Sequence, residues 1–126
     1  MEWTLHKLSS SLAASIARFE EEEMGVTPAR VTVMVEEDLV MVHLKEVLSL
    51  SERALASTES GQALLQRFNT SLINAGSFPS IRDQVSQALQ REVVEVQISL
   101  SSLSGSLVIV FTLAGVVLPL LQGLFA

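Results

Sequence analysis

The C-terminal end of the chain constrains the fold most, because no charged residue follows Glu95. The last 21 residues, SLVIVFTLAGVVLPLLQGLFA, run from Ser106 to Ala126 and include thirteen Leu, Ile, Val or Phe residues. A helix of this length would reach about 30 Å, which is enough to cross the hydrocarbon of a bilayer. Either the segment spans a membrane, or part of it is a strand in the core of a folded domain.

The residues around this segment favour a strand. In VVEVQISL, residues 93–100, apolar and polar side chains alternate as in a half-buried strand. Val94, Val96, Ile98 and Leu100 are expected on one face, and Glu95, Gln97 and Ser99 on the other. The loop SSLSGS then leads to LVIVFTL, residues 107–113, which is β-branched and apolar on both faces. We therefore predict a strand over 107–113, with a transmembrane helix over 106–126 as the alternative.

The N-terminal segment has the spacing of an amphipathic helix. Its apolar stripe consists of Leu5, Leu8, Leu12, Ile16 and Phe19. The helix is expected to end near Met24, because Gly25 suits a left-handed C-cap and Pro28 prevents continuation. Glu20 falls between the apolar positions, so we expect it and the following three glutamates to face water.

Two β-branched runs follow, and they predict an antiparallel hairpin. Val31, Val33 and Val35 alternate with Thr32 and Met34, and Val40, Val42 and Leu44 alternate with Met41 and His43. The acidic residues Glu36, Glu37 and Asp38 lie between the runs, where a turn is expected. These three residues lack the regular oxygen-ligand spacing of a calcium loop.

Helices are predicted in the middle of the chain. Ser49 and Glu52 have capping-box spacing, which starts a helix that bends at Gly61. An apolar stripe is expected at Leu64, Leu65, Phe68 and Leu72. After the break at Gly76 to Pro79, Ser80 is a candidate N-cap for a helix whose core residues are Ile81, Val85, Ala88 and Leu89.

These elements predict an α+β fold of two layers: a roughly four-stranded, mainly antiparallel sheet with helices on one face, in the order α-β-β-α-α-β-β. The domain covers residues 1–113, and residues 114–126 form an apolar tail. Such a tail needs a cover, either its own sheet or a partner. We expect a partner interface at Val116, Val117, Leu118, Leu120, Leu121, Leu124 and Phe125.

Composition excludes several function classes. A formal net charge of −6 with scattered bases gives no electrostatic reason to bind nucleic acid. There is no cysteine, and no nucleophile elbow or phosphate loop occurs. The two histidines, His6 and His43, have no metal-ligand spacing. We expect no catalytic, cofactor or metal site. The N-terminus does not resemble a signal peptide, which favours the cytoplasm.

From Leu8 to Leu113 the chain resembles a bacterial family named after MpsC, a component of a sodium-translocating, membrane-potential-generating system. The resemblance rests on the Gly25-to-Pro28 turn, the Val-rich hairpin, LSLSER (residues 48–53) and REVVEVQIS (residues 91–99). It implies an accessory role near ion or bicarbonate transport and supplies no catalytic residue. The turn is GVTP rather than a compact Gly-x-Gly-Pro, and the tail is additional.

The function expected from these observations is that of a non-catalytic accessory or regulatory subunit that docks or dimerises through its sheet and tail. The expected partners are a second copy of the chain, a membrane protein, or both, with peripheral membrane contact through the tail. Two alternatives stay open. One is a tail-anchored membrane protein, and the other is a small-molecule sensor or carrier that uses the space between helices and sheet.

Overall fold

The computed structural model describes residues 2–75 and 80–117, except for the side chains of residues 2–6, 23, 24 and 75. It confirms the α+β fold. The helices are α1 (Glu2–Phe19), its π-helical extension (Glu20–Met24), α2 (Leu50–Ala56), α3 (Glu59–Ala75) and α4 (Ile81–Leu89). The strands are β1 (Arg30–Glu36), β2 (Leu39–Lys45), β3 (Val93–Ser101) and β4 (Ser106–Leu113).

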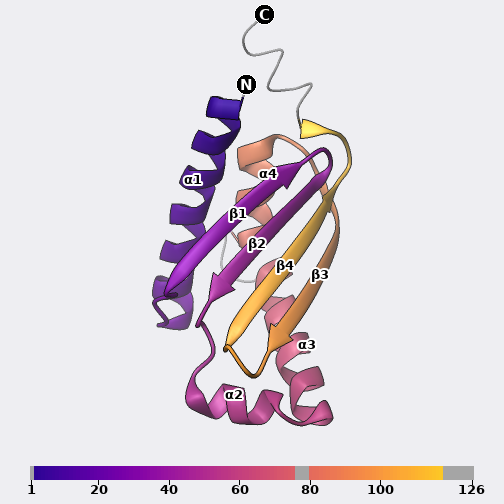
Figure 1. The fold of residues 1–126 in the computed structure, drawn as a ribbon. Helices are drawn as coiled ribbons and strands as arrows, with labels where there is room; N and C mark the ends of the chain where they lie inside the picture. Colours follow the sequence, from indigo (N-terminus) through magenta and orange to yellow (C-terminus); the bar gives the residue numbers. More distant parts are fainter. Residues whose placement is uncertain (1, 76–79, 118–126) are drawn as a thin grey trace, which may run out of the picture.

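The four strands form one antiparallel sheet in the order β1-β2-β4-β3 (Figure 1). The two hairpins lie side by side and are joined through β2 and β4. The predicted strand over 107–113 thus forms as β4, which is an inner strand of the sheet, and a single helix from 106 to 126 is ruled out. Among the described helices, none combines the length and the hydropathy needed to cross a bilayer.

The described helices lie on one face of the sheet. In Figure 1, α3 and α4 lie behind the strands, and α1 runs along β1 at the edge of the sheet. Alternate strand residues point toward these helices, because successive side chains leave a strand on opposite faces, and those of β2 and β4 are buried. The largest of these core side chains on β2 and β4 are Val40, Val42, Leu44, Leu107, Ile109 and Phe111. The opposite face has no second layer in the described part of the chain.

The end of α1 differs from the prediction in one respect. The helix does stop at Gly25, which has a φ of 67° and caps it in the left-handed region. Glu20, however, lies four residues after Ile16 and so falls on the same buried stripe, where only 7% of its surface is exposed. Burial, with a smaller effect of the Glu52 charge, raises the pKa of the Glu20 carboxyl to about 7.

The predicted bent helix is in fact two helices. The capping box of Ser49 and Glu52 forms as expected, but the chain breaks at Ser57 and Thr58 rather than at Gly61. Gly61 lies in the first turn of α3, where a Cβ atom would come 1.9 Å from the carbonyl oxygen of Leu55. The close approach of the two helices therefore explains this glycine.

The predicted stripe on α3 is half wrong. Leu65 is buried and Leu72 is half-buried, but Leu64 and Phe68 are exposed, and Ile73 is buried in their place. Helix α4 matches its prediction: the Ser80 side chain caps it together with Asp83, and Ile81, Val85 and Leu89 are buried.

Strand β3 contains an irregularity that the alternation did not predict. The register shifts between Val93 and Glu95, so Val93 enters the core and Val94 is exposed. From Glu95 onward the predicted alternation holds, with Glu95, Gln97 and Ser99 on the uncovered side. The shift thus places Glu95 beside Thr112 at the end of the uncovered face.

Candidate functional site

The uncovered face of the sheet is the candidate functional surface, and we call it the open face. Its residues follow from the strand register, because they alternate with the core residues. They form rows across the strands. From one end to the other, these rows are Arg30 and Lys45; Thr32, His43, Val108 and Ser99; Met34, Met41, Val110 and Gln97; and Glu36, Leu39, Thr112 and Glu95.

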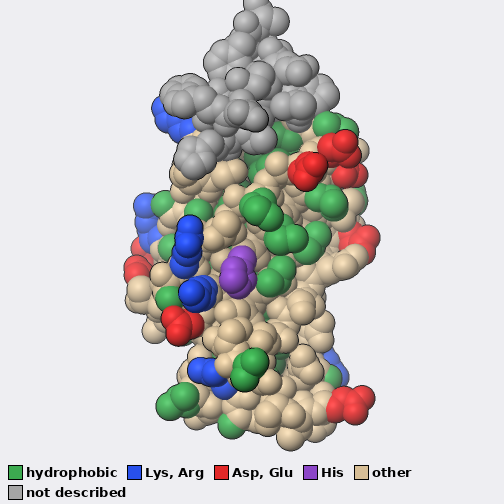
Figure 2. Space-filling model, viewed as in Figure 1, with side chains coloured by type: hydrophobic (Ala, Val, Ile, Leu, Met, Phe, Trp, Pro, Cys, Tyr) green, Lys and Arg blue, Asp and Glu red, His purple; other side chains and the backbone are tan. Residues whose placement is uncertain are grey.

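The middle of the open face is apolar, and we call Met34, Leu39, Met41, Val108 and Val110 its apolar centre. Met34 is 56% exposed, Leu39 46% and Met41 39%. Isolated exposed apolar residues are ordinary on protein surfaces, but a contiguous group indicates a binding site. Figure 2 shows these hydrophobic side chains gathered in one patch on the face toward the viewer.

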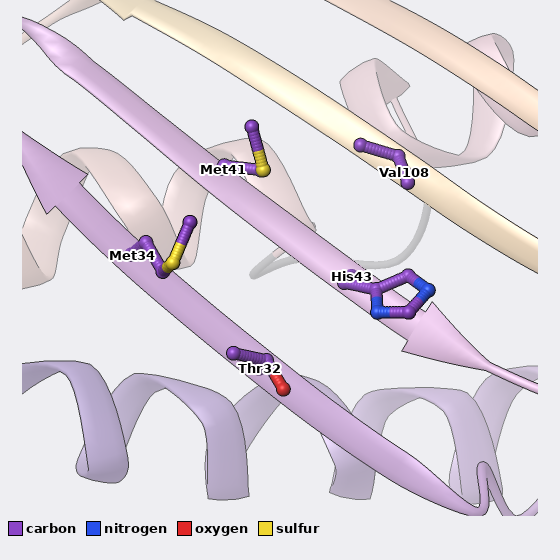
Figure 3. Close-up of a pocket in the computed structure, with 5 residues that line it drawn as sticks. All are labelled: Thr32, Met34, Met41, His43 and Val108. Atoms are coloured by element: carbon purple, nitrogen blue, oxygen red, sulfur yellow. The ribbon is translucent and has the colours of Figure 1, made fainter.

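A shallow hollow of about 310 Å³ lies within this patch, lined by Thr32, Met34, Met41, His43 and Val108. In Figure 3 the two methionines come from adjacent strands, and the His43 ring lies near Val108. Met34 and Met41 are direct cross-strand partners, as are Thr32 and His43. Methionine side chains adapt readily to the shape of a partner, which suits a surface that binds another protein.

Charges divide between the two ends of the open face. Arg30 and Lys45 are cross-strand partners at one end, which we call the basic end. Glu36 on β1 and Glu95 on β3 mark the other end, which we call the acidic end. In Figure 2 basic side chains lie to the left of the hydrophobic patch, with some acidic ones near them, and a group of acidic side chains lies at its upper right. The surface therefore has an apolar middle between ends of opposite charge.

The acidic end is held in shape by the backbone around the first hairpin turn. The Leu113 amide donates to the carbonyl of Asp38 at 2.8 Å, and the Val117 amide donates to the carbonyl of Glu37 at 3.0 Å. Glu37 adopts a positive φ of 55°, which lets this short turn close without glycine. Glu37 and Asp38 thus form the predicted turn, while Glu36 is the last residue of β1.

His43 is the one histidine whose side chain is described, and it lies half-buried on the open face. Among the described residues, no group of three or more His, Asp or Glu side chains could hold a metal ion. The hollow beside His43 is otherwise lined by one threonine and apolar side chains. Its chemistry is that of contact and packing.

The tail residues expected at a partner interface are mostly outside the described residues. Leu118, Leu120, Leu121, Leu124 and Phe125 fall in that undescribed range. Val116 is 41% exposed, whereas Val117 is 1% exposed and packs in the core of its own domain. The Ala114 amide donates a hydrogen bond to the carbonyl of Glu92, so the folded domain extends beyond Leu113.

Sequence reasoning did not single out the residues of the apolar centre. Two signals were present: residues 107–113 are apolar at both alternating sets of positions, and methionines occupy two of the outward positions of the first hairpin. Their meaning depended on which sheet face the helices cover, because a face covered by a second layer would have made them core residues.

Comparisons with known proteins match most of the chain. The family model for MpsC, described as a Na⁺-translocating membrane potential-generating system, matches residues 4–115. The uncharacterized protein YbcI of Bacillus subtilis (strain 168) is 24% identical over 106 residues, which is 84% of this chain and 85% of that protein. No solved structure matches significantly. Because the family model spans all four strands, the chain belongs to the MpsC family.

Proposed function

We propose that this protein is a non-catalytic accessory or regulatory subunit of a membrane-potential-generating system, and that it acts by binding a protein through the open face. The observation that carries the proposal is the exposed apolar centre on a sheet whose other face is covered by helices. The family description supplies the physiological setting.

The composition of the open face supports protein binding. Stable interfaces place apolar and methionine-rich residues at the centre and charged residues at the rim. Met34 and Met41 occupy the centre, and the charged residues lie at the two ends. When such a face binds a partner, its apolar side chains are removed from water while its charged side chains stay near water. The burial of apolar surface favours association.

The residues of the hollow support binding over catalysis. General acid–base or nucleophilic catalysis needs a reacting group together with a second group that activates or orients it. His43 is the single titratable side chain among the residues that line the hollow. Thr32 lies directly across from it, but no carboxylate on the open face is nearer than the acidic end, two rows away.

The proposal also includes a location. We place the protein in the cytoplasm, associated with the membrane component of the system through the apolar tail, residues 114–126. The charge-free sequence after Glu95 supports this role, because its leucines and valines need an apolar environment. Contact with the membrane surface would be peripheral.

The test is made in the native bacterium, with the gene deleted and then restored as wild type, Met41→Glu or Leu64→Glu. Met41 and Leu64 are both exposed apolar residues, but Leu64 lies on α3 away from the open face. Membrane potential and Na⁺ efflux are measured under sodium load. We expect the deletion and Met41→Glu to lower both, and Leu64→Glu to restore them.

Two results would count against this function. If deletion changes neither membrane potential nor Na⁺ efflux, the protein is not part of such a system. If Met41→Glu restores both as well as wild type does, the open face is not its working surface. Circular dichroism of the purified variants checks that both are folded.

A further inference from the structure

We infer that the open face binds the open face of a second copy of this chain, with the strands of the two sheets running in opposite directions. The inference rests on the proposed function, since it names a partner for the same surface. It is carried by the separation of charge along the strands together with the apolar centre between the charged ends.

The two charged ends are far enough apart to act separately. Arg30 and Glu36 are six residues apart on β1, which corresponds to about 20 Å along a strand. This separation exceeds the screening length of roughly 8 Å at physiological ionic strength. A partner therefore meets a basic end and an acidic end as distinct features.

Two-fold symmetry allows two ways to stack identical sheet faces, and charge distinguishes them. With the axis parallel to the strands, each end lies over the same end of the second copy, and β1 lies over β3, so Glu36 meets the like charge of Glu95. With the axis across the strands, each basic end lies over an acidic end. The second arrangement is favoured because opposite charges attract and like charges at an interface are costly.

The favoured arrangement also fits the rows of the open face. An axis between the two central rows places Met41 over His43 of the second copy, and Val110 over Val108 of the second copy. Arg30 then lies over Glu36 of the second copy, and the symmetry repeats each contact twice. The apolar centre is thus buried at the middle, with ion pairs at both ends.

The size of the face predicts the strength of the dimer. Four strands at about 4.8 Å spacing and seven residues in length give a face of about 450 Å² in projection. Two such faces would bury a total area of about 900 Å², without the additional surface of the protruding side chains. This area is near the lower limit for a specific interface. We expect a dissociation constant in the micromolar range.

An anionic lipid surface is a less suitable occupant of this face. The chain carries a net charge of −6, and Glu36 and Glu95 lie on the open face itself. Anionic headgroups would be repelled from that end. A second copy satisfies both ends at once, because it presents the complementary charge at each.

The experiment uses two charge-reversal variants of the full chain, Arg30→Glu and Glu36→Arg, in sedimentation velocity from about 1 to 100 μM. Each variant alone places like charges over one another in the antiparallel dimer, so self-association should weaken roughly tenfold or more. An equal mixture of the two restores opposite charges at both ends. We expect the mixture to form a heterodimer at about the wild-type affinity.

Matched controls are Arg67→Glu and Glu59→Arg on α3, which reverse exposed charges elsewhere and should leave association unchanged. A monomeric wild type across this range would overturn the inference and leave a different protein as the occupant. Single variants that dimerise as well as wild type would also overturn it. Neither result bears on the membrane potential of the deletion strain, so the inference and the proposed function can fail independently.

Discussion

The two faces of the sheet are built from the same four strands and both carry apolar side chains on β2 and β4, yet they have different roles. Toward the helices lie Val40, Val42 and Leu44, which are fully buried. On the other side Leu39 and Met41 alternate with them and remain in water. Hydrophobicity alone therefore did not decide which residues form the core of this domain; the position of the helices did.

Alternate residues of a single strand therefore serve different purposes: one set stabilises the fold, and the other is available for binding. Side chains on the covered face contribute to folding, because folding removes them from water. Side chains on the open face gain this contribution only when a partner arrives. The predictions below compare the same kinds of change on the two faces.

Truncating Phe111 should have the largest effect on stability. Its side chain is fully buried in the middle of β4. Phe111→Ala should cost about 3–5 kcal/mol of unfolding free energy, because it removes apolar burial and leaves a cavity. Met41→Ala on the open face should cost less than about 1 kcal/mol at concentrations where the protein is monomeric. Urea unfolding at low protein concentration measures both, and equal losses would contradict the distinction between the faces.

The covered side also contains an ionisable group, and this predicts a pH dependence. The pKa of Glu20 is raised from 4.5 to about 7, so the folded state holds its proton over a range where the unfolded state has lost it. Stability from this group is present below pH 4.5 and falls as pH rises to about 7, at about 1.4 kcal/mol per pH unit. The total loss is about 3 kcal/mol.

Glu20→Gln removes this titration and keeps the shape of the side chain. We expect the variant to be more stable than wild type by about 3 kcal/mol at pH 8 and similar to it at pH 4. Urea unfolding across this pH range gives the difference between the two proteins at each pH. A constant difference would show that Glu20 is not buried in the folded protein.

Replacing valine by threonine changes the side-chain shape very little, so the same substitution can be compared on the covered face and on the open face. Val42 is fully buried on the covered face, and Val110 is half-buried on the open face of the next strand. Val42→Thr places a hydroxyl in the core and should cost about 1–3 kcal/mol. Val110→Thr should change stability by less than about 0.5 kcal/mol. Thermal unfolding followed by circular dichroism measures both, and a larger loss at Val110 would mean that the open face is covered within the monomer.

Much of the fold could be predicted because local rules determine it. The hairpin of β1 and β2, the caps at Ser49 and Ser80, and the C-cap at Gly25 follow from periodicity and short-range hydrogen bonding. The strand over 107–113 could be chosen over a membrane helix because its neighbours already formed a hairpin pattern.

The errors arose where tertiary contacts override local pattern. Glu20 is a surface residue by type, but it lies one turn beyond Ile16 and continues the buried stripe of the N-terminal helix. A glycine at position 61 indicated a bend, but Gly61 lies inside α3. A glycine is needed there because α2 packs too closely for a Cβ atom. Docking through the sheet was predicted, but the strand residues that form the open face were not, because their exposure depends on which side the helices pack.

An antiparallel dimer through the open face brings defined positions of the two copies close together, and crosslinking tests this directly. The chain has no cysteine, so single substitutions give defined sites for a short bis-maleimide crosslinker. Leu39 and Lys45 mark the two ends of β2. We expect Leu39→Cys mixed with Lys45→Cys to crosslink, and neither variant alone to crosslink efficiently, because like positions lie about 20 Å apart along the strands. Leu64→Cys on α3 is the control. Efficient crosslinking of Leu39→Cys to itself, with none in the mixture, would contradict the account.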